Sequence, residues 1–266
     1  MEKRTGFIGG GNMAEAIIKG LLAGGVPAAE LAVSEPHEPR RKLLAERYGV
    51  QVLSDNVALC RMSDTVILAV KPQVASQVLS HLEATTDKLF ISIMAGVKSA
   101  AIEGMLGAGS RVVRVMPNTP ALVLEGASAI ARGYNATDDD LVLARRIFDL
   151  VGTTCVVEEK LLDAVTGVSG SGPAYVLTFI EALSDAGVKH GLTRDVATAL
   201  AAQTVYGTAK LLLDSHEHPA VLKSNVASPG GTTIAAMHSL DRDGFRAATI
   251  NAVDVCVARS KELGEK

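Results

Sequence analysis

The stretch Phe7-Ile8-Gly9-Gly10-Gly11-Asn12-Met13-Ala14 decides the fold. It reads as the end of an apolar strand that includes Gly6, a glycine-rich turn and the start of a helix, in the order that a dinucleotide pyrophosphate site requires. Gly9 supplies the tight turn, Gly11 lets the backbone approach a diphosphate, and Ala14 is small enough for the helix to pack on the strand. We therefore expect cofactor contacts from Gly6 to Met13. A glycine-rich turn without a ligand is the alternative reading of the motif alone.

Length and composition indicate a globular chain of one large or two modest domains. It has 266 residues, of which 48% are hydrophobic. The 29 acidic residues outnumber the 26 basic ones and aromatic residues make up only 3%, which argues against nucleic acid as a partner. No uninterrupted apolar segment of about 18 residues or more occurs, which argues against a membrane span.

The cysteines and the N-terminal residues bear on the compartment. Cys60, Cys155 and Cys256 are far apart, odd in number and without the spacing of a metal site, so they indicate thiols in a reducing compartment. Lys3 and Arg4 precede an apolar run as in a signal peptide, but the glycine turn interrupts that run. We expect a cytoplasmic protein.

Strand and helix signals alternate along the first 159 residues. Strands are predicted at 6–8, 31–34, 50–53, 65–70, 89–93, 111–116, 127–131 and 153–157. Helices are predicted between them at 13–24, 39–47, 56–61, 74–82, 99–106 and 138–150. Asp55 and Thr137 are expected to cap two of these helices. The βαβ repetition predicts an α/β fold with a Rossmann-type doubly wound, mainly parallel sheet.

The pattern changes after residue 159, because no convincing strand follows. Helices are predicted at 161–168, 173–188, 194–213, 220–225, 234–239 and 245–263. Gly191 is expected to stop one of these helices and Thr193 to cap the next. We therefore expect a dinucleotide-binding domain at 1–159 and an all-α domain at 160–266. The helix at 194–213 is apolar on most faces and cannot be buried by so small a domain, which predicts a homodimer formed by this domain.

Two further motifs have competing interpretations. The stretch Ser228-Pro229-Gly230-Gly231-Thr232-Thr233 leaves backbone N–H groups free at a helix start, which suits a carboxylate, although a Pro-Gly turn with a threonine cap is the alternative. The stretch His216-Glu217-His218 lacks the i, i+4 spacing that puts two imidazoles on one helical face. We expect a solvated loop there and no metal site.

Six stretches, in order, make the chain resemble the pyrroline-5-carboxylate reductases over its whole length. They are residues 6–14, 69–73, 92–97, 114–120, 167–175 and 228–234. The resemblance implies reduction of L-Δ1-pyrroline-5-carboxylate to L-proline with NAD(P)H, the last step of proline biosynthesis. It also implies an N-terminal Rossmann domain, a helical dimerisation domain, and dimers that assemble further into decamers.

The resemblance also implies binding residues. For the cofactor these are Asn56 on the adenine side, Ala69, Val70, Lys71, Pro72, Ala95, Gly96 and Val97 around the ribose and nicotinamide, and Asn118. Near the substrate they are Glu159, Asn225, Ser228, Gly230, Gly231, Thr232 and Thr233. Without the family, Lys71-Pro72 is an ordinary helix start, Ala95-Gly96 an ordinary turn and Asn56 the first turn of a short helix. Thr233 is expected to hydrogen-bond the ring nitrogen, as an orienting donor or relay rather than a true general acid.

The choice of cofactor rests on the end of the second strand. Glu35 lies where a ribose-binding acid is expected, which by itself favours the 2′-hydroxyl of NAD. Ser34 with Arg40 or Arg41 can equally hold the 2′-phosphate of NADP. Because the family often prefers NADPH, we expect NADP(H) to be preferred, with NAD(H) possible.

Two other functions share part of this sequence pattern. A β-hydroxyacid dehydrogenase would carry a catalytic lysine after its Gly-Ser-Gly turn, whereas Gly170-Ser171-Gly172 is followed by no lysine before Lys189. A nucleotide-sensing regulator would keep the Rossmann fold but would not need the carboxylate seat at residues 228–233.

Overall fold

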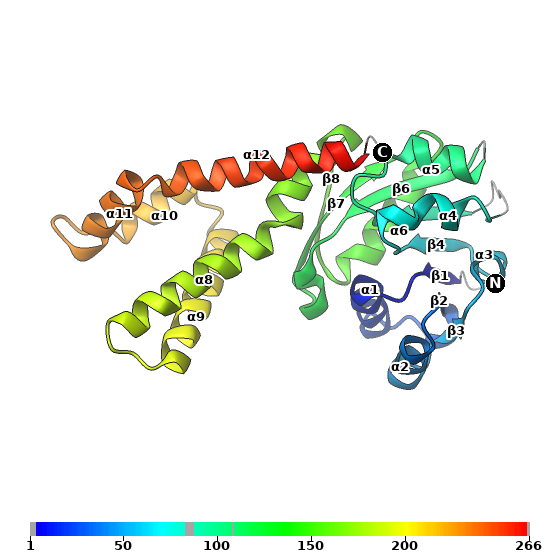
Figure 1. Ribbon diagram of the computed structural model, residues 1–266, viewed down its shortest axis with the longest axis horizontal. Helices are drawn as coiled ribbons and strands as arrows, with labels where there is room; N and C mark the ends of the chain where they lie inside the picture. The colour runs from blue at the N-terminus through cyan, green and yellow to red at the C-terminus, as the bar shows by residue number, and fades with distance from the viewer. Residues whose placement is uncertain (1–3, 83–87, 108, 265–266) are drawn as a thin grey trace. The chain divides into compact units, whose positions relative to one another are not determined.

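A computed structural model describes residues 4–82, 88–107 and 109–264 (Figure 1). The chain divides into two compact units. The first contains the described residues up to Ser171 together with those from Cys256 onward, and the second is Gly172–Val255. This division falls after the expected boundary at residues 159 and 160, and it returns the end of the last helix to the first unit.

The first unit is built on one eight-stranded sheet, in the order β3-β2-β1-β4-β5-β6-β7-β8. Neighbouring strands are parallel except β6 and β7, which are antiparallel. The strands are β1 (Thr5–Ile8), β2 (Leu31–Ser34), β3 (Gln51–Leu53), β4 (Thr65–Leu68), β5 (Leu89–Ser92), β6 (Arg111–Met116), β7 (Gly126–Arg132) and β8 (Gly152–Val156). The predicted doubly wound, mainly parallel sheet is confirmed, and its order reverses between β1 and β4, where such sheets bind ligands.

Helices cover both faces of this sheet (Figure 1). They are α1 (Asn12–Ala23), α2 (Glu38–Tyr48), α3 (Asn56–Met62), α4 (Ala75–Leu79), α5 (Ser99–Leu106), α6 (Asp138–Asp149) and α7 (Leu162–Val165). Successive strand residues point to opposite faces, so Phe7 of β1 packs in one core with α1, α2 and α6. Ile8 packs in the other core with α3, α4 and α5.

The predicted caps of two helices are confirmed by hydrogen bonds. The Asp55 carboxylate accepts from the N–H groups of Val57 and Ala58 at the start of α3. Thr137 and Asp140 form a reciprocal capping box at the start of α6. Thr193 precedes α9 as expected, but its side chain makes no capping bond.

The segment between β8 and the second unit departs from the single helix predicted at 161–168. It forms a 3₁₀ turn at Glu159–Leu161, α7 at Leu162–Val165 and a π-helical turn at Thr166–Gly170. In the π turn the N–H of Ser171 donates to the carbonyl oxygen of Thr166 at 2.8 Å. The Thr166 and Ser169 hydroxyls also donate to backbone carbonyl oxygens four residues earlier, which competes with a regular helix.

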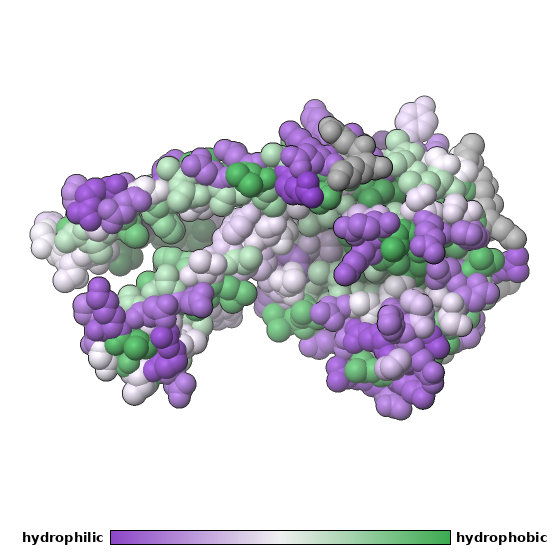
Figure 2. Space-filling model, viewed as in Figure 1, coloured by the Kyte–Doolittle hydropathy of each residue, from purple (hydrophilic) through white to green (hydrophobic). Residues whose placement is uncertain are grey.

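The second unit is helical, as predicted. Its helices are α8 (Gly172–Lys189), α9 (Arg194–Ser215), α10 (Pro219–Asn225), α11 (Thr232–Arg242) and the first part of α12 (Phe245–Gly264). Along α9 only Ala197 and Ala201 are buried, while Leu200 is 56% and Tyr206 58% exposed. Figure 2 shows further hydrophobic residues uncovered along the helices of this unit. The single chain therefore leaves much apolar surface for another chain to cover.

Candidate active site

The glycine turn joins β1 to α1 and is held by the ends of β2 and β4. Gly9 adopts a φ of 98°, and its N–H donates to the Ser34 carbonyl oxygen at 2.8 Å. A Cβ on Gly9 would lie 2.6 Å from the carbonyl oxygen of Ala69. Because glycine alone fits both the angle and the space, Gly9 makes the tight turn that the sequence predicts.

Glu35 and Arg40 stabilise this turn. Glu35 is 9% exposed, and its carboxylate accepts from the N–H of Gly10 at 2.8 Å and from the N–H of His37 at 3.0 Å. The Nε of Arg40 donates to the carbonyl oxygen of Gly10 at 2.6 Å, and its guanidinium pairs with Glu15 at 2.6 Å. Both oxygens of Glu35 are thus engaged by the protein's own backbone.

The start of α1 has backbone N–H groups that suit an anion. Gly11 precedes the helix with a φ of −68°, and no side chain among the described residues caps this end. A Cβ on Gly11 would meet no atom of the described chain within 4 Å, so neither the backbone angle nor the packing requires glycine here. Asn12 and Met13 form the first turn, and the fully buried Ala14 packs the helix on the sheet. These N–H groups and the space beside Gly11 fit a diphosphate.

A cleft of about 530 Å³ continues from this turn along the ends of β2 and β3. Ser34 and Asn56 both line it, and the Ser34 hydroxyl donates to the Asn56 Oδ1 at 2.6 Å. Val70, one of the residues expected to contact the cofactor, also lines it, together with Gln77 and His81. No sequence motif marks Gln77 or His81, because they enter the cleft from the exposed side of α4 and the turn after it.

The two arginines after β2 have different surroundings. Arg41 donates from Nη1 to the carbonyl oxygens of Glu35 and Pro36, both at 2.7 Å, and Pro36 lines the cleft. Arg40 is instead directed to the glycine turn. Of the two, Arg41 is therefore the cation held at the loop that borders Ser34.

The residues after β4 begin the next wall. The N–H of Ala69 donates to the carbonyl oxygen of Ile8 at 2.9 Å, which ties this loop to β1. Lys71 is exposed and precedes a 3₁₀ turn that begins at Pro72. Lys71 and Pro72 are not among the residues that line the 530 Å³ cleft.

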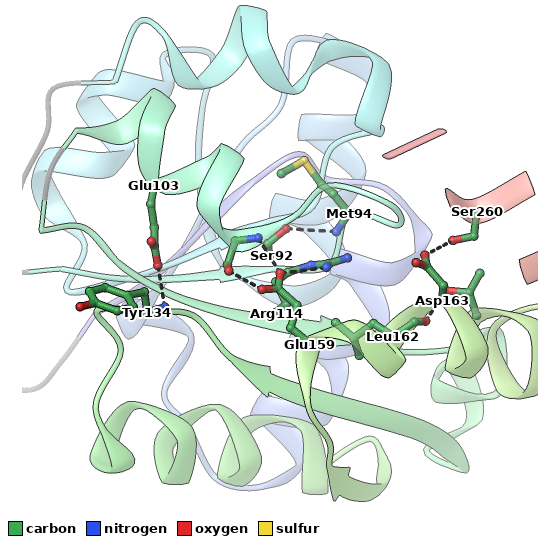
Figure 3. A network of polar contacts seen from close by, with 11 residues as sticks. Ser92, Met94, Glu103, Arg114, Tyr134, Glu159, Leu162, Asp163 and Ser260 are labelled. Atoms are coloured by element: carbon green, nitrogen blue, oxygen red, sulfur yellow. Dashed lines mark hydrogen bonds and ion pairs between the residues drawn. The ribbon is translucent and has the colours of Figure 1, made fainter. Parts of the chain in front are cut away.

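The turn at residues 95–97 follows β5 and leads into α5. Glu159 holds the start of that helix. Gly96 is buried with a φ of 77°. The N–H of Ser99, the first residue of α5, donates to Glu159 Oε1 and its hydroxyl to Glu159 Oε2, both at 2.6 Å. The buried Arg114 of β6 pairs with Glu159 Oε1 at 3.0 Å (Figure 3). Glu159 therefore fixes the start of α5 from a position 60 residues further along the chain.

These contacts also lower the pKa of Glu159. Burial alone would raise the pKa of this carboxyl group, but the hydrogen bonds from Ser99 and the charge of Arg114 outweigh that effect. The carboxylate is ionised at neutral pH, and its oxygens are shared among three donors. Neither Arg114 nor Ser99 is predicted to be a site residue by the motifs of the sequence. The signal for Arg114 was its place as a charged residue within an apolar strand.

Asn118 makes two structural hydrogen bonds. Its Nδ2 donates to the carbonyl oxygen of Ser169 in the π turn at 3.1 Å, and its Oδ1 accepts from the N–H of Ala127 in β7 at 2.9 Å. The residue is 8% exposed. Its amide thus links the end of β6 to the π turn and to β7.

The predicted carboxylate seat lies in the second unit. Gly230 has a φ of 69°, and the N–H of Gly231 donates to the carbonyl oxygen of Ser228 at 3.0 Å. Thr232 and Thr233 are the first two residues of α11, and no side chain in the described part of the chain caps this end. Asn225 ends α10 three residues before Ser228. The N–H groups at the start of α11 therefore suit a carboxylate.

The His-Glu-His stretch serves helix capping in part. His218 Nδ1 accepts from the N–H of Ala220 at 3.2 Å at the start of α10. Within residues 4–82, 88–107 and 109–264, no group of three or more His, Cys, Asp or Glu side chains is arranged to hold a metal ion. In the same ranges, no helix combines the length and the apolar character that crossing a membrane would require.

Comparison with known proteins gives a consistent result along the chain. A family model described as pyrroline-5-carboxylate reductase dimerisation matches residues 159–263, and one described as NADP oxidoreductase, coenzyme F420-dependent, matches residues 4–96. A pyrroline-5-carboxylate reductase of Methanosarcina acetivorans is 50% identical over 99% of both chains. The solved pyrroline-5-carboxylate reductase of Coxiella burnetii superposes with a TM-score of 0.93 at 36% identity over 100% of both chains. That of Plasmodium falciparum, with NADP bound, has a TM-score of 0.90 at 34% identity and covers 99% of this chain and 98% of its own.

Proposed function

The chain belongs to the pyrroline-5-carboxylate reductase family, and we propose on that basis which of its residues carry each part of the reaction. It is an NAD(P)H-dependent oxidoreductase that reduces the C=N bond of L-Δ1-pyrroline-5-carboxylate and yields L-proline, the last step of proline biosynthesis. The likeness over the full length of the curated relatives carries this function. A bound nicotinamide supplies the hydride, and the protein supplies position and electrostatics.

The cofactor is bound by the first unit. The N–H groups at the start of α1 hold the diphosphate, and the Ser34–Asn56 pair borders the adenosine ribose. The turn at Ala95, Gly96 and Val97 contacts the nicotinamide, and Ala69, Val70, Lys71 and Pro72 contact the adjoining ribose. Asn118 acts on this site through the backbone that it fastens.

The substrate is bound by the start of α11. The N–H groups beside Gly231 hold the carboxylate, and the Thr233 hydroxyl hydrogen-bonds the ring nitrogen. Hydride attack on a C=N carbon is favoured when that nitrogen carries a proton, and a threonine hydroxyl orients this proton without a useful pKa of its own. In the second unit Asn225, Ser228, Gly230 and Thr232 complete this site, and Glu159 of the first unit keeps the substrate role that the family resemblance implies.

The preferred cofactor is NADPH, with NADH also accepted. Both oxygens of Glu35 accept hydrogen bonds from backbone N–H groups, so Glu35 has less capacity to accept a hydrogen bond from a ribose hydroxyl. Arg41 lies at the loop beside Ser34, where its charge suits a 2′-phosphate. We expect Arg41→Ala to lower kcat/KM for NADPH roughly 10- to 100-fold, as loss of a hydrogen bond to a charged group does, and to leave NADH unchanged. Arg40→Ala should affect both cofactors equally, because Arg40 supports the glycine turn.

The decisive assay follows the absorbance of the reduced nicotinamide with the pyrroline substrate, run separately with each cofactor and with proline quantified as product. Consumption of cofactor with equimolar proline supports the proposal. No consumption with either cofactor would turn the assignment to a nucleotide-sensing protein. A strong preference for NADH would reverse the assignment of NADPH.

The enzyme is oligomeric through its dimerisation domain. Its dimers assemble further, into decamers, and the enzyme is cytoplasmic. Sedimentation of the purified protein distinguishes a dimer from a decamer by mass.

A further inference from the structure

Three small residues follow one another at intervals of four along the last turns of α12. They are Cys256, Ser260 and Gly264, and this spacing puts them on one face of the helix. All three belong to the first unit. A helix face of small residues lets another segment of the chain approach the helix backbone closely. The contacts of each residue show which segments pack against this face.

Cys256 and Ser260 fix α12 to the segment that follows β8. The Cys256 thiol lies 3.1 Å from the Ser171 hydroxyl at the end of the π turn. The Ser260 hydroxyl, 5% exposed, donates to Asp163 Oδ1 at 2.6 Å (Figure 3). Asp163 lies in α7, four residues after Glu159, whose carboxylate anchors α5. The end of α12 and the start of α5 are therefore fixed to the same short segment.

Gly264 continues this face onto the turn at residues 95–97. A Cβ on Gly264 would overlap the carbonyl oxygen of Gly96, and a Cβ on Gly96 would lie 3.4 Å from the backbone N of Gly264 and from the carbonyl oxygen of Ser260. The two glycines thus pack backbone on backbone. A cavity of about 370 Å³ beside them is lined by Gly96, Arg114, Glu159, Asp163, Ser260 and Gly264.

We infer that the last turns of α12 brace the turn at residues 95–97, and that Gly264 is a positioning residue for the nicotinamide end of the cofactor site. The inference rests on the proposed function, which assigns the nicotinamide to that turn. The turn is held from one side by Glu159 through Ser99 and from the other by Gly264. Because reacting groups displaced by about 1 Å lose up to about 100-fold in rate, a small shift of this turn is measurable.

The test compares two ligands on the full-length Gly264→Ala variant. NADPH carries the nicotinamide, whereas 2′-phospho-ADP-ribose has the same adenosine and diphosphate groups without it. We expect the variant to bind NADPH roughly tenfold more weakly and to lose roughly 10- to 100-fold in kcat/KM, with 2′-phospho-ADP-ribose bound as by the wild type. Gly104→Ala in α5 is the matched control, because a Cβ there meets no atom of the described residues within 4 Å.

Two further variants keep the inference falsifiable. Ser260→Ala removes the bond to Asp163 and should weaken NADPH binding by a smaller factor than Gly264→Ala does. A chain that ends at Arg259 lacks the brace and should lose at least as much NADPH affinity as Gly264→Ala. Wild-type NADPH affinity in both Gly264→Ala and the shortened chain would overturn the inference, and so would equal loss of both ligands. Wild-type protein that binds NADPH but does not consume it would overturn the proposed function, while the ligand comparison would still decide the role of Gly264.

Discussion

At the residue scale, Glu159 shows how one carboxylate orders several elements. It accepts from the backbone and the hydroxyl of Ser99 and pairs with the buried Arg114. Removing the charge while keeping the shape leaves Arg114 without its ionic partner. Glu159 is therefore a better target for testing the architecture of the site than any exposed ion pair nearby.

We expect Glu159→Gln to lower the free energy of unfolding by roughly 1.5–3 kcal/mol, the range for hydrogen bonds to charged groups. Urea unfolding at fixed protein concentration measures the change. Glu158→Gln is the control, since Glu158 pairs with Lys160 at the surface and should contribute less than about 1 kcal/mol. Equal stability of the two variants would show that the Ser99 and Arg114 contacts contribute nothing.

The stability difference between wild type and Glu159→Gln depends on pH with a definite sign. Because the folded pKa of Glu159 is lowered from 4.5, the unfolded chain binds its proton first on acidification. The stabilisation is fully present above the unfolded pKa and is lost as pH falls through the folded one. The gap in unfolding free energy between wild type and Glu159→Gln should thus stay constant near neutral pH and narrow below pH 4.5. A gap that widens on acidification would contradict the lowered pKa.

The prediction for Thr233 concerns the rate of the reaction rather than the stability of the fold. Loss of a positioned proton donor costs about 10²–10⁴-fold in rate, so Thr233→Ala should lower kcat by that factor while the fold persists. Thr249→Ala in the same unit is the control, because the Thr249 hydroxyl only donates to the Phe245 carbonyl oxygen of its own helix. If Thr233→Ala kept more than half of the wild-type kcat, Thr233 would have no role in the reaction.

At the element scale, the turn before α1 contains two glycines, Gly9 and Gly11, that differ in why a glycine is needed. Gly9 is required by its φ of 98° and by the Ala69 carbonyl oxygen, whereas Gly11 has an ordinary backbone angle and open space beside it. Packing therefore explains Gly9, whereas for Gly11 only the proposed diphosphate site gives a reason for a glycine.

Gly11→Ala should keep the free energy of unfolding within about 0.5 kcal/mol of the wild type, since the folded chain accommodates a Cβ there. It should nevertheless weaken NADPH binding roughly tenfold or more, because that Cβ enters the space of the diphosphate. Gly9→Ala should instead unfold more readily, by about 1–3 kcal/mol for a strained backbone. Calorimetric titration and urea unfolding separate the two effects. Unchanged NADPH affinity in Gly11→Ala would place the diphosphate elsewhere.

The elements themselves were largely predictable from the sequence, because buried parallel strands are continuous apolar runs between turn residues. The antiparallel pairing of β6 with β7 was not, since periodicity carries no information on strand direction. The sequence predicts a regular helix where the π turn forms, because local hydroxyl bonding and contact with the sheet leave no periodic signal. Glu159 binds partners that lie 45 and 60 residues away in the sequence. These contacts, like the return of α12 to the first unit, depend on tertiary packing that no local pattern encodes.

At the scale of the whole molecule, the apolar surface of the second unit requires explanation. Leu200, Tyr206 and Leu213 of α9 are all more than half exposed in the single chain. Fully burying such a side chain contributes about 1.5–3 kcal/mol, and in a symmetric dimer every contact occurs twice. The matched dimerisation model spans this helix, so these residues are candidates for the interface.

We expect Leu200→Glu to shift the protein from oligomer to monomer at micromolar concentration, because a buried carboxylate without a partner costs more than the lost apolar contact. Both copies carry the change, so the penalty is paid twice at one interface. Val142→Glu is the matched control, since Val142 lies on α6 of the first unit and is 47% exposed. Analytical ultracentrifugation measures the mass of each variant. A wild type that sediments as a monomer, or a Leu200→Glu variant that stays as large as Val142→Glu, would show that α9 is not covered by a second chain.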